Sequence, residues 1–415
     1  MISFESEETK LENGIQKTKK HSLFQYIIVV AAACLVYGVM QGVHDNYGIM
    51  MNGLVEYTGI SYSSISFCIG IGALVYGLGQ PLFGLIALKK SNTYVILIGI
   101  TLTIIGLVVT PLCKSVPSLL LFFWLVLPFG TTGLGFAIVM GAITPVLGAK
   151  RAAIVSGIVQ ASAGIGDALM SPALASLISE FDVRAAMSVF GILFLVMTPI
   201  AFWLRGQNKR AAEQVKEVKT EKRPIGEVVK AAFKDHDYHM IQMGFATCGF
   251  NMSIIESHLF SQFLSYGIAR SAASVALTIY GIATMTGAVG TGFLGAKFSM
   301  KNVLGTTYAM RVIISLGFLF LPKSVSFAFI AAALLRFSGD ATIPPTTGII
   351  SKKYGEKNMA VLYGIALIGH QCGAFASAYL GGVFVDNGMG YAPLWIVNLC
   401  LAAIAATSSY AIREK

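Results

Sequence analysis

The chain has 415 residues, of which 55% are hydrophobic and only 12% are charged, and its mean hydropathy is +0.72. Soluble domains carry about 25% charged residues, so this composition excludes a water-soluble globular protein and indicates a polytopic membrane protein. The formal net charge of +10 raises the question of nucleic-acid binding, which the positions of the basic residues answer below.

The first 24 residues form a polar segment in which four glutamates precede three lysines. A secretory signal would have a basic start, a short apolar core and a cleavage site, so we expect residues 1–24 to be a cytoplasmic tail. The six cysteines are scattered singly and form neither a disulfide framework nor a zinc-binding pattern. We therefore expect no metal site and no cofactor.

Twelve apolar runs follow this tail, and each is long enough to cross the hydrocarbon, which takes about 20 residues. The first six precede a polar linker at 205–237, the other six follow it, and a short tail at 412–415 ends the chain. The sequence therefore predicts an all-α membrane protein with two six-helix bundles, 25–204 and 238–411. The runs are 25–52, 62–87, 93–112, 117–142, 152–178, 185–204, 238–264, 271–295, 303–321, 327–349, 359–385 and 392–411.

The lysines and arginines fix the expected orientation. If the N-terminus is inside, the inner segments hold 24 of the 30 basic residues and the outer loops hold 4, while Arg311 and Arg336 lie within spans. Basic residues favour the cytoplasmic side, so we expect both termini to be cytoplasmic. The basic excess is a topology signal, and no nucleic-acid surface is predicted.

The two halves resemble each other. The segment "GLIALKKSNT" (84–93) follows the second span, and "GFLGAKFSMK" (292–301) follows the second span of the second half. Each has a glycine at the end of its span and a lysine five residues later, Lys89 and Lys297. Paired halves with a cytoplasmic linker are typical of transporters built from repeats, and the predicted bundles are accordingly pseudo-symmetric.

The whole chain resembles the major facilitator superfamily, and in particular its bacterial monocarboxylate-transporter-like branch, which is related to the oxalate/formate exchangers. The resemblance rests on "YAMRVIISLGFLFLP" (308–322), the segment 340–391, "YGLGQPLFG" (76–84) and "SGIVQASAGIGDALMSPALASLI" (156–178). It implies a transporter of small organic acids that works as a monomer in the cell membrane.

Three positions depart from the family pattern. Leu88 and Ala296 occupy places where the superfamily loop motif has an aspartate, so gating must rely on other contacts. Ala288 stands where monocarboxylate and oxalate carriers tend to have a substrate-binding arginine. His370 falls where oxalate exchangers have a lysine, so the resemblance implies a titratable cation at that position.

The stretch "LRFSGDATIPPTTG" (335–348) brings charge into the tenth span. Arg336 and Asp340 are four residues apart and so share one helix face, while Arg311 lies at a similar depth in the ninth span. One interpretation is a structural ion-pair cluster that includes Arg311. The other is that Arg336 and Asp340 border the central cavity of this fold. Pro344 and Pro345 interrupt the helix ladder and predict either a static kink or a moving gate.

Polar residues also occur at matching positions of the first and seventh spans. A charge at bilayer depth costs at least about 2.5–3.5 kcal/mol, so by default it faces a partner or a wet cavity. We expect these residues, with Gln160 and Asp167 of the fifth span and His370 of the eleventh, to bind substrate or couple ions, although each histidine is alternatively a core residue. Those of the first and seventh spans are His44, Asp45, Asn46, Asn251, Glu256 and His258.

These features predict a secondary active transporter of a small carboxylate, driven by a proton gradient or a counter-substrate, with a small-molecule substrate and the lipid bilayer as its partners. The acids outnumber the buried arginines, which keeps open exchange or export of zwitterionic, cationic or amphipathic molecules. No HExxH, GxSxG or P-loop GxxxxGK(S/T) motif is present, and no GxGxxG opens a helix after a strand, so no enzyme is predicted. The two-fold repeat argues against a channel or receptor.

Overall fold

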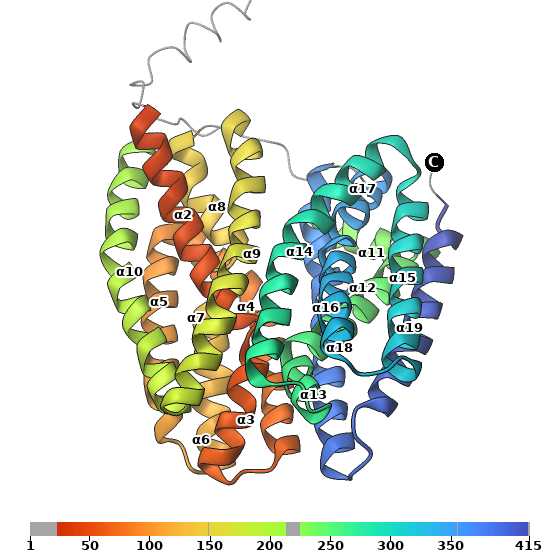
Figure 1. Ribbon diagram of the computed structural model, residues 1–415. Coiled ribbons are helices and arrows are strands. Elements are labelled where there is room, and N and C mark those ends of the chain that lie inside the picture. Colours follow the sequence, from red (N-terminus) through yellow and green to blue (C-terminus); the bar gives the residue numbers. More distant parts are fainter. Residues whose placement is uncertain (1–22, 148, 213–224, 355, 414–415) are drawn as a thin grey trace, which may run out of the picture.

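The computed structural model describes residues 23–147, 149–212, 225–354 and 356–413 (Figure 1). In these ranges the chain is helical and contains no strand, so the all-α fold predicted from the sequence is confirmed. The expected tail at 1–24 and the middle of the expected linker, 213–224, lie outside the described residues, apart from the start of the first helix.

The helices of the first half form one bundle (Figure 1). The sixth predicted span continues beyond residue 204, because α10 runs to Ala212. The elements are α2 (Leu23–His44), α3 (Tyr47–Thr58), α4 (Tyr62–Lys89), α5 (Asn92–Val109), η1 (Thr110–Leu112), α6 (Val116–Leu121), η2 (Phe122–Val126), α7 (Leu127–Thr132), α8 (Phe136–Leu147), α9 (Ala149–Glu180) and α10 (Val183–Ala212).

The helices of the second half form a second bundle beside the first (Figure 1). A short amphipathic helix, α11, lies within the segment predicted as a linker. The elements are α11 (Ile225–Ala232), α12 (His236–Ser253), η3 (Ile254–Leu259), α13 (Phe260–Ser265), α14 (Arg270–Lys297), α15 (Met300–Phe320), α16 (Val325–Asp340), α17 (Ile343–Tyr354), α18 (Glu356–Asp386) and α19 (Ala392–Ala411).

Ten helical segments of the described chain are long and apolar enough to cross a membrane. The predicted seventh and eighth spans are helical, as α12–η3–α13 and α14, but are not among these ten. The seventh carries Asn251, Glu256 and His258, and such polar residues lower the hydropathy of a span. The count of twelve membrane spans therefore stays a prediction.

The molecule has two distinct ends. The described chain begins at Leu23 and ends near the C-terminus on the same side, which we call the terminal face (Figure 1). Helices α3, α6 and α13 lie toward the other side, which we call the opposite face (Figure 1). Both ends of the described chain lying on one side agrees with an even number of crossings.

The two bundles are built on the same helix pairs. In the first bundle α2 packs on α9, and in the second α12 packs on α18. At Gly38 and Gly166, and again at Gly249 and Gly373, a Cβ atom would collide with the backbone of the partner helix. Small residues at a crossing let two membrane helices approach closely. The repeat predicted from the sequence is therefore visible in the packing.

The first and seventh spans are irregular at equivalent places. In the first, α2 ends at His44 and α3 begins at Tyr47, with Asp45 and Asn46 in the turn between them. The Asn46 side chain donates to the Gly42 carbonyl at 2.7 Å, and such bonds compete with the helix ladder. In the seventh, the chain passes through the π-helix η3, a feature often found at functional sites.

The tenth span is broken where the sequence predicted an interruption. Helix α16 ends at Asp340 and α17 begins at Ile343. Pro344 and Pro345 fall in the first turn of α17, where the backbone N–H groups have no intrahelical partner and their loss costs least. The prolines thus start a new helix two residues beyond the charged end of α16.

Candidate functional site

Arg336 lies at the centre of a buried group of acids. Its Nη2 atom is 2.9 Å from Asp45 Oδ2 and 3.4 Å from Asp167 Oδ2, and its Nε atom is 3.7 Å from Asp340 Oδ2. Its Nη1 atom donates to the Tyr280 hydroxyl at 2.6 Å. The Asp340 side chain is 13% exposed, whereas those of Arg336, Asp45 and Asp167 are at most 3% exposed. Asp340 is therefore the weakest of the three acidic partners.

This group joins the two bundles. Asp45, after α2, and Asp167, in α9, belong to the first bundle, whereas Arg336 lies in α16 and Tyr280 in α14 of the second. The guanidinium carbon also lies 4.6 Å from the centroid of the Tyr280 ring, a cation–π distance. A buried ion pair is strongly destabilised when one partner is removed, so Arg336 ties the two bundles together in this conformation.

Asp45 has partners on both of its oxygens. Gln41 Nε2 donates to Asp45 Oδ1 at 2.5 Å, and His44 Nδ1 lies 3.2 Å from the same oxygen. The His44 ring is packed against Tyr47 and Tyr76, with centroids 5.3 and 4.6 Å apart. The break between α2 and α3 thus presents a carboxylate held from two sides and a histidine held by aromatic rings.

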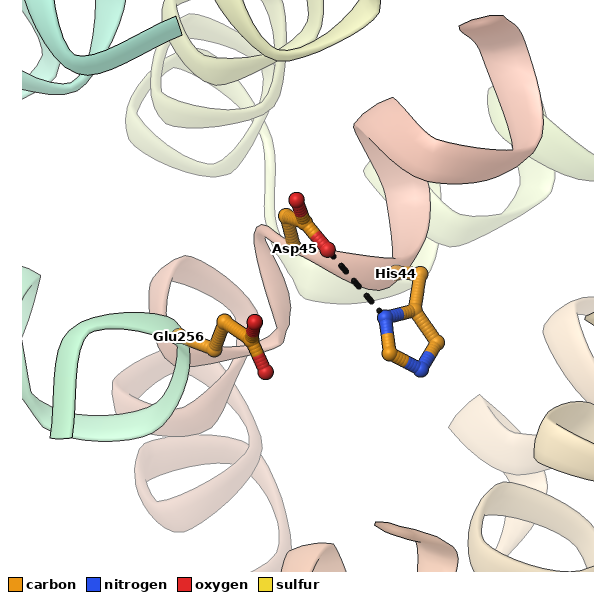
Figure 2. A group of neighbouring side chains, drawn as sticks. All are labelled: His44, Asp45 and Glu256. Carbon is orange, nitrogen blue, oxygen red and sulfur yellow. Dashed lines mark hydrogen bonds and ion pairs between the residues drawn. The ribbon is translucent and has the colours of Figure 1, made fainter. Parts of the chain in front are cut away.

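Glu256 reaches the same place from the second bundle. Figure 2 shows its carboxylate near His44 and Asp45, and one ligand atom from each of the three residues lies within 4.8 Å of the others. Glu256 is half-buried in η3. Within the described chain no hydrogen bond or ion pair to its carboxylate occurs. The irregular parts of the first and seventh spans therefore face each other.

Acids outnumber cations in this group. Asp45, Asp167, Asp340 and Glu256 gather around one guanidinium, that of Arg336, in the part of the chain that the structure describes. Burying an unpaired carboxylate is costly. The group therefore favours the uptake of positive charge, either as protons or as a bound cation.

The structure differs from one expectation, that for Arg311. A structural ion pair was expected for this residue, but among the described residues it forms none. Its Nη2 atom donates to the carbonyls of Ser338 and Gly339 at 2.7 and 3.1 Å and lies 3.3 Å from Cys248 Sγ. Those carbonyls lie at the C-terminal end of α16, where the helix leaves its last C=O groups without partners. Arg311 therefore holds the helix break, and of the two arginines only Arg336 forms ion pairs with the acids among the described residues.

Asn251 points into its own bundle in this conformation. It is fully buried and donates to Asn398 Oδ1 of α19 at 3.3 Å. Asn251 precedes η3, and the wider π turn changes the direction in which residues on its two sides point. A role of Asn251 in substrate binding or coupling therefore stays a prediction, while Glu256, within η3, faces the first bundle.

His258 joins the bundles on the way to the opposite face. Its Nε2 atom donates to the Ala378 carbonyl at 2.9 Å, so in the neutral ring Nδ1 accepts from the Tyr62 hydroxyl, 3.0 Å away. Nearby, the Ser63 N–H donates to Asp386 Oδ2 at 2.9 Å. His258 is fully buried in this conformation, which agrees with the alternative of a core histidine, and its role in binding or coupling stays a prediction. These contacts close the bundles against each other toward the opposite face.

The remaining predicted residues form no hydrogen bond or ion pair with these acids in the part of the chain that the structure describes. Gln160 is half-buried and accepts from the Tyr37 hydroxyl at 3.5 Å. His370 is half-buried beside the Phe245 ring, with centroids 5.1 Å apart, and its Nδ1 atom has no hydrogen-bond partner in the described chain. Asn46 donates to the Gly42 carbonyl at the break between α2 and α3, as described above.

A family model described as Major Facilitator Superfamily matches residues 28–265, more than half of the chain. The chain belongs to the major facilitator superfamily. The family predicted from the sequence is thus confirmed. The protein is a multi-pass integral membrane protein of a family of secondary transporters, and it is not an enzyme.

Individual members of the superfamily match the chain at low identity. The uncharacterised MFS-type transporter YcxA of Bacillus subtilis (strain 168) is 26% identical over 249 residues, which are 58% of this chain and 59% of that protein. Monocarboxylate transporter 11 of Mus musculus is 23% identical over 273 residues, 64% of this chain and 58% of that protein. The chain therefore spans less than two thirds of the length of either curated relative.

Among solved structures, the nucleoside transporter NupG has a TM-score of 0.76 at 13% identity, covering 93% of this chain and 98% of that one. At this identity the likeness shows the fold alone.

Tyr280 and Cys248 contact the two buried arginines but were not among the site residues predicted from the sequence. Tyr280 bonds Arg336, and Cys248 contacts Arg311. Tyrosine and cysteine are ordinary residues in apolar helices, so no local signal distinguishes these two from their neighbours. Their contacts become visible only in the folded chain, where α14 and α12 lie beside α16.

Proposed function

We propose that the protein moves a small organic anion, a carboxylate, across the cell membrane by alternating access, with coupled movement of protons. The observation that supports this proposal is the position of Arg336, a buried guanidinium shared by acids of both bundles. A guanidinium matches a carboxylate in geometry and charge. The name of one relative, monocarboxylate transporter 11, agrees with this substrate class.

Proton coupling follows from competition for Arg336. In this conformation its Nη2 atom is occupied by Asp45 and Asp167, so a substrate carboxylate must displace them. A proton on one of these acids weakens its bond to the guanidinium and so makes Arg336 available to the substrate. Glu256 lies beside Asp45 without a hydrogen-bond partner in the described chain, which makes it the first candidate to take up a proton and pass it to Asp45.

The same event links binding to movement of the bundles. Arg336 belongs to the second bundle, and Asp45 and Asp167 belong to the first. When their charge is neutralised, the strongest polar tie between the bundles is lost. The remaining contacts near His258 and Ser63 then separate more easily, which opens the opposite face. In this scheme the protein works as a monomer and needs no cofactor.

Uptake by purified protein in liposomes tests the proposal. Carboxylates, amino acids, nucleosides and polyamines are offered with and without an inward proton gradient. We expect accumulation of a carboxylate that rises with the gradient and is lost in Arg336→Gln. Transport of a carboxylate that survives this substitution would contradict the role of Arg336.

A second candidate is transport of a zwitterion or a cation. The excess of carboxylates over guanidinium in the group favours it, because a positively charged substrate would neutralise the acids directly. In the same liposomes this function would appear as uptake of an amino acid or polyamine that is lost in Glu256→Gln and unaffected by carboxylates.

A further inference from the structure

His44, Asp45 and Glu256 form a group with the composition of a metal site. The three residues offer one imidazole nitrogen and two carboxylate oxygens, and one such atom from each lies within 4.8 Å of the others (Figure 2). Zinc binds nitrogen and oxygen ligands at about 2.0–2.2 Å, so two ligands of one ion lie at most about 4.4 Å apart. Side-chain shifts of about 1 Å or less would therefore close the group around an ion.

The group has the supporting contacts that metal ligands require. Gln41 Nε2 donates to Asp45 Oδ1, and the rings of Tyr47 and Tyr76 fix the orientation of His44. Hydrogen bonds and packing of this kind orient metal ligands and strengthen binding. Arg336 meets Asp45 through the other oxygen, Oδ2, which leaves Oδ1 directed toward His44.

Two further observations point to a bound cation. The acids around Arg336 are in excess, and Asp167 Oδ1 is a buried carboxylate oxygen without a hydrogen-bond partner in the described chain. Glu256, half-buried, likewise makes no bond among the described residues, although it faces two polar side chains (Figure 2). A divalent cation supplies the charge that this group lacks.

We propose that His44, Asp45 and Glu256 bind one divalent transition-metal ion, with Zn²⁺ or Mn²⁺ as the probes, between the two bundles. The imidazole ligand favours these ions over alkali cations and Mg²⁺ or Ca²⁺, which take oxygen ligands. His44 and Asp45 come from the first bundle and Glu256 comes from the second. A bound ion therefore cross-links the bundles and holds the opposite face closed.

Metal binding by the purified full-length chain tests this inference without any transport substrate. The protein is stripped with EDTA, dialysed against Zn²⁺ or Mn²⁺, and analysed for bound metal by mass spectrometry. We expect one ion per chain, and at least a tenfold weaker affinity in Glu256→Gln and in His44→Ala. His239→Ala, which removes an exposed histidine at the terminal face, is the matched control and should bind as the wild type does.

A second measurement reports whether the opposite face is closed, through the accessibility of a thiol placed there, and requires no substitution in the metal site. Ser63→Cys, on a background without the native cysteines, places a thiol at the contact with Asp386. We expect Mn²⁺ to slow the labelling of this thiol; Mn²⁺ is the probe in this measurement because Zn²⁺ would bind the introduced thiolate itself. The proposal is overturned if the wild type binds no stoichiometric metal, or if the double variant His44→Ala/Glu256→Gln binds metal as tightly as the wild type. Neither result depends on the identity of the transported substrate.

Discussion

Arg336 Nη2 lies 2.9 Å from Asp45 Oδ2 although the two residues are 291 positions apart in the sequence. The pair joins the tenth span of one half to the first span of the other, and both side chains are at most 3% exposed. In the alternating-access scheme proposed above, such a pair belongs to one conformation and breaks in the next. It is therefore the contact most directly linked to the transport cycle.

The three acidic partners of Arg336 should differ in their effect on stability. Asp45→Asn removes the shortest buried ion pair, and breaking such a pair costs about 3–5 kcal/mol when no other partner remains. Since Asp167 and Asp340 remain, we expect a loss at or below the lower end of that range. Asp340→Asn should cost less than about 1 kcal/mol, because its pair is long and partly exposed.

Thermal unfolding in detergent, followed by intrinsic fluorescence, measures both variants. Asp182→Asn, which alters an exposed ion pair with Arg184, serves as the control for the substitution itself. Equal losses for Asp45→Asn and Asp340→Asn would contradict the ranking. The sequence alone led us to expect Asp340 as the main partner of Arg336, and by distance it is the weakest of the three.

Glu256→Gln should separate proton coupling from substrate movement. Glutamine keeps the size of the side chain and removes its ionisation, so we expect uptake in liposomes to lose its dependence on the pH gradient. Exchange of internal for external substrate, which needs no net proton movement, should partly persist. Glu180→Gln, at the end of α9 and exposed, is the matched control.

If Glu256→Gln and Asp45→Asn both transport with unchanged pH dependence, another group carries the proton. Asp167 would then be the next candidate, because its Oδ1 atom is buried without a hydrogen-bond partner in the described chain.

Local composition was enough to predict the architecture. Apolar runs, a polar linker and the bias of basic residues are properties of short segments, and they led to two helical bundles; the resemblance of segments such as 308–322 and 156–178 led to the correct family. They also directed attention to Asp45, Glu256 and Arg336, because a charge in an apolar helix needs a partner. The residues of a segment thus indicate which of its side chains are buried and which need a polar partner.

The partners themselves could not be read from the sequence. Asp45 meets Arg336 only because α2 packs on α9, α9 on α14 and α14 on α16, and the sequence contains no signal for contacts that distant. Arg311 and Asn251 show a second limit. Each is polar and lies in an apolar helix, yet each points into its own bundle. The direction of a side chain around a helix depends on packing and on the π turn in η3.

Arg311→Met should lower the stability of the fold without changing substrate recognition. Methionine fills a similar unbranched volume but donates no hydrogen bond to the carbonyls of Ser338 and Gly339. Leaving buried acceptors unsatisfied costs about 1–3 kcal/mol, so the melting temperature should fall. The apparent affinity for the transported substrate should stay as in the wild type.

Paired measurements on Arg311→Met and Arg336→Met distinguish the two arginines. Both variants lose a buried guanidinium, but only Arg336→Met should abolish transport by protein that remains folded. Loss of substrate affinity in folded Arg311→Met would show that Arg311 takes part in binding.

Asp235 should make stability depend on pH in the acid range. Although burial opposes it, hydrogen bonds from the Asp237 N–H, Lys353 and Tyr354 lower the pKa of Asp235 below its ordinary value. The unfolded chain therefore binds more protons as the pH falls through this range. The stability that Asp235 contributes is present above the ordinary pKa of an aspartate, about 4, and is lost as the pH falls toward the lowered value.

Melting curves between about pH 6 and pH 3 measure this dependence. We expect Asp235→Asn to melt lower than the wild type at pH 6, with the difference shrinking as the pH decreases. A constant difference across this range would mean that the ionisation of Asp235 contributes nothing. Glu180→Gln is the comparison, since Glu180 is exposed and lies at the end of α9, at the other end of the molecule.

The terminal face should be the cytoplasmic face. The inner segments defined by the sequence hold 24 of the 30 basic residues, and basic residues in short loops favour the cytoplasm. Single cysteines on a cysteine-free background report the orientation in intact cells. Lys216→Cys, in the linker outside the described residues, should resist a membrane-impermeant thiol reagent, whereas Lys114→Cys, exposed near the start of α6, should react. The reverse pattern would invert the topology, so that the contacts near His258 would close the cytoplasmic side.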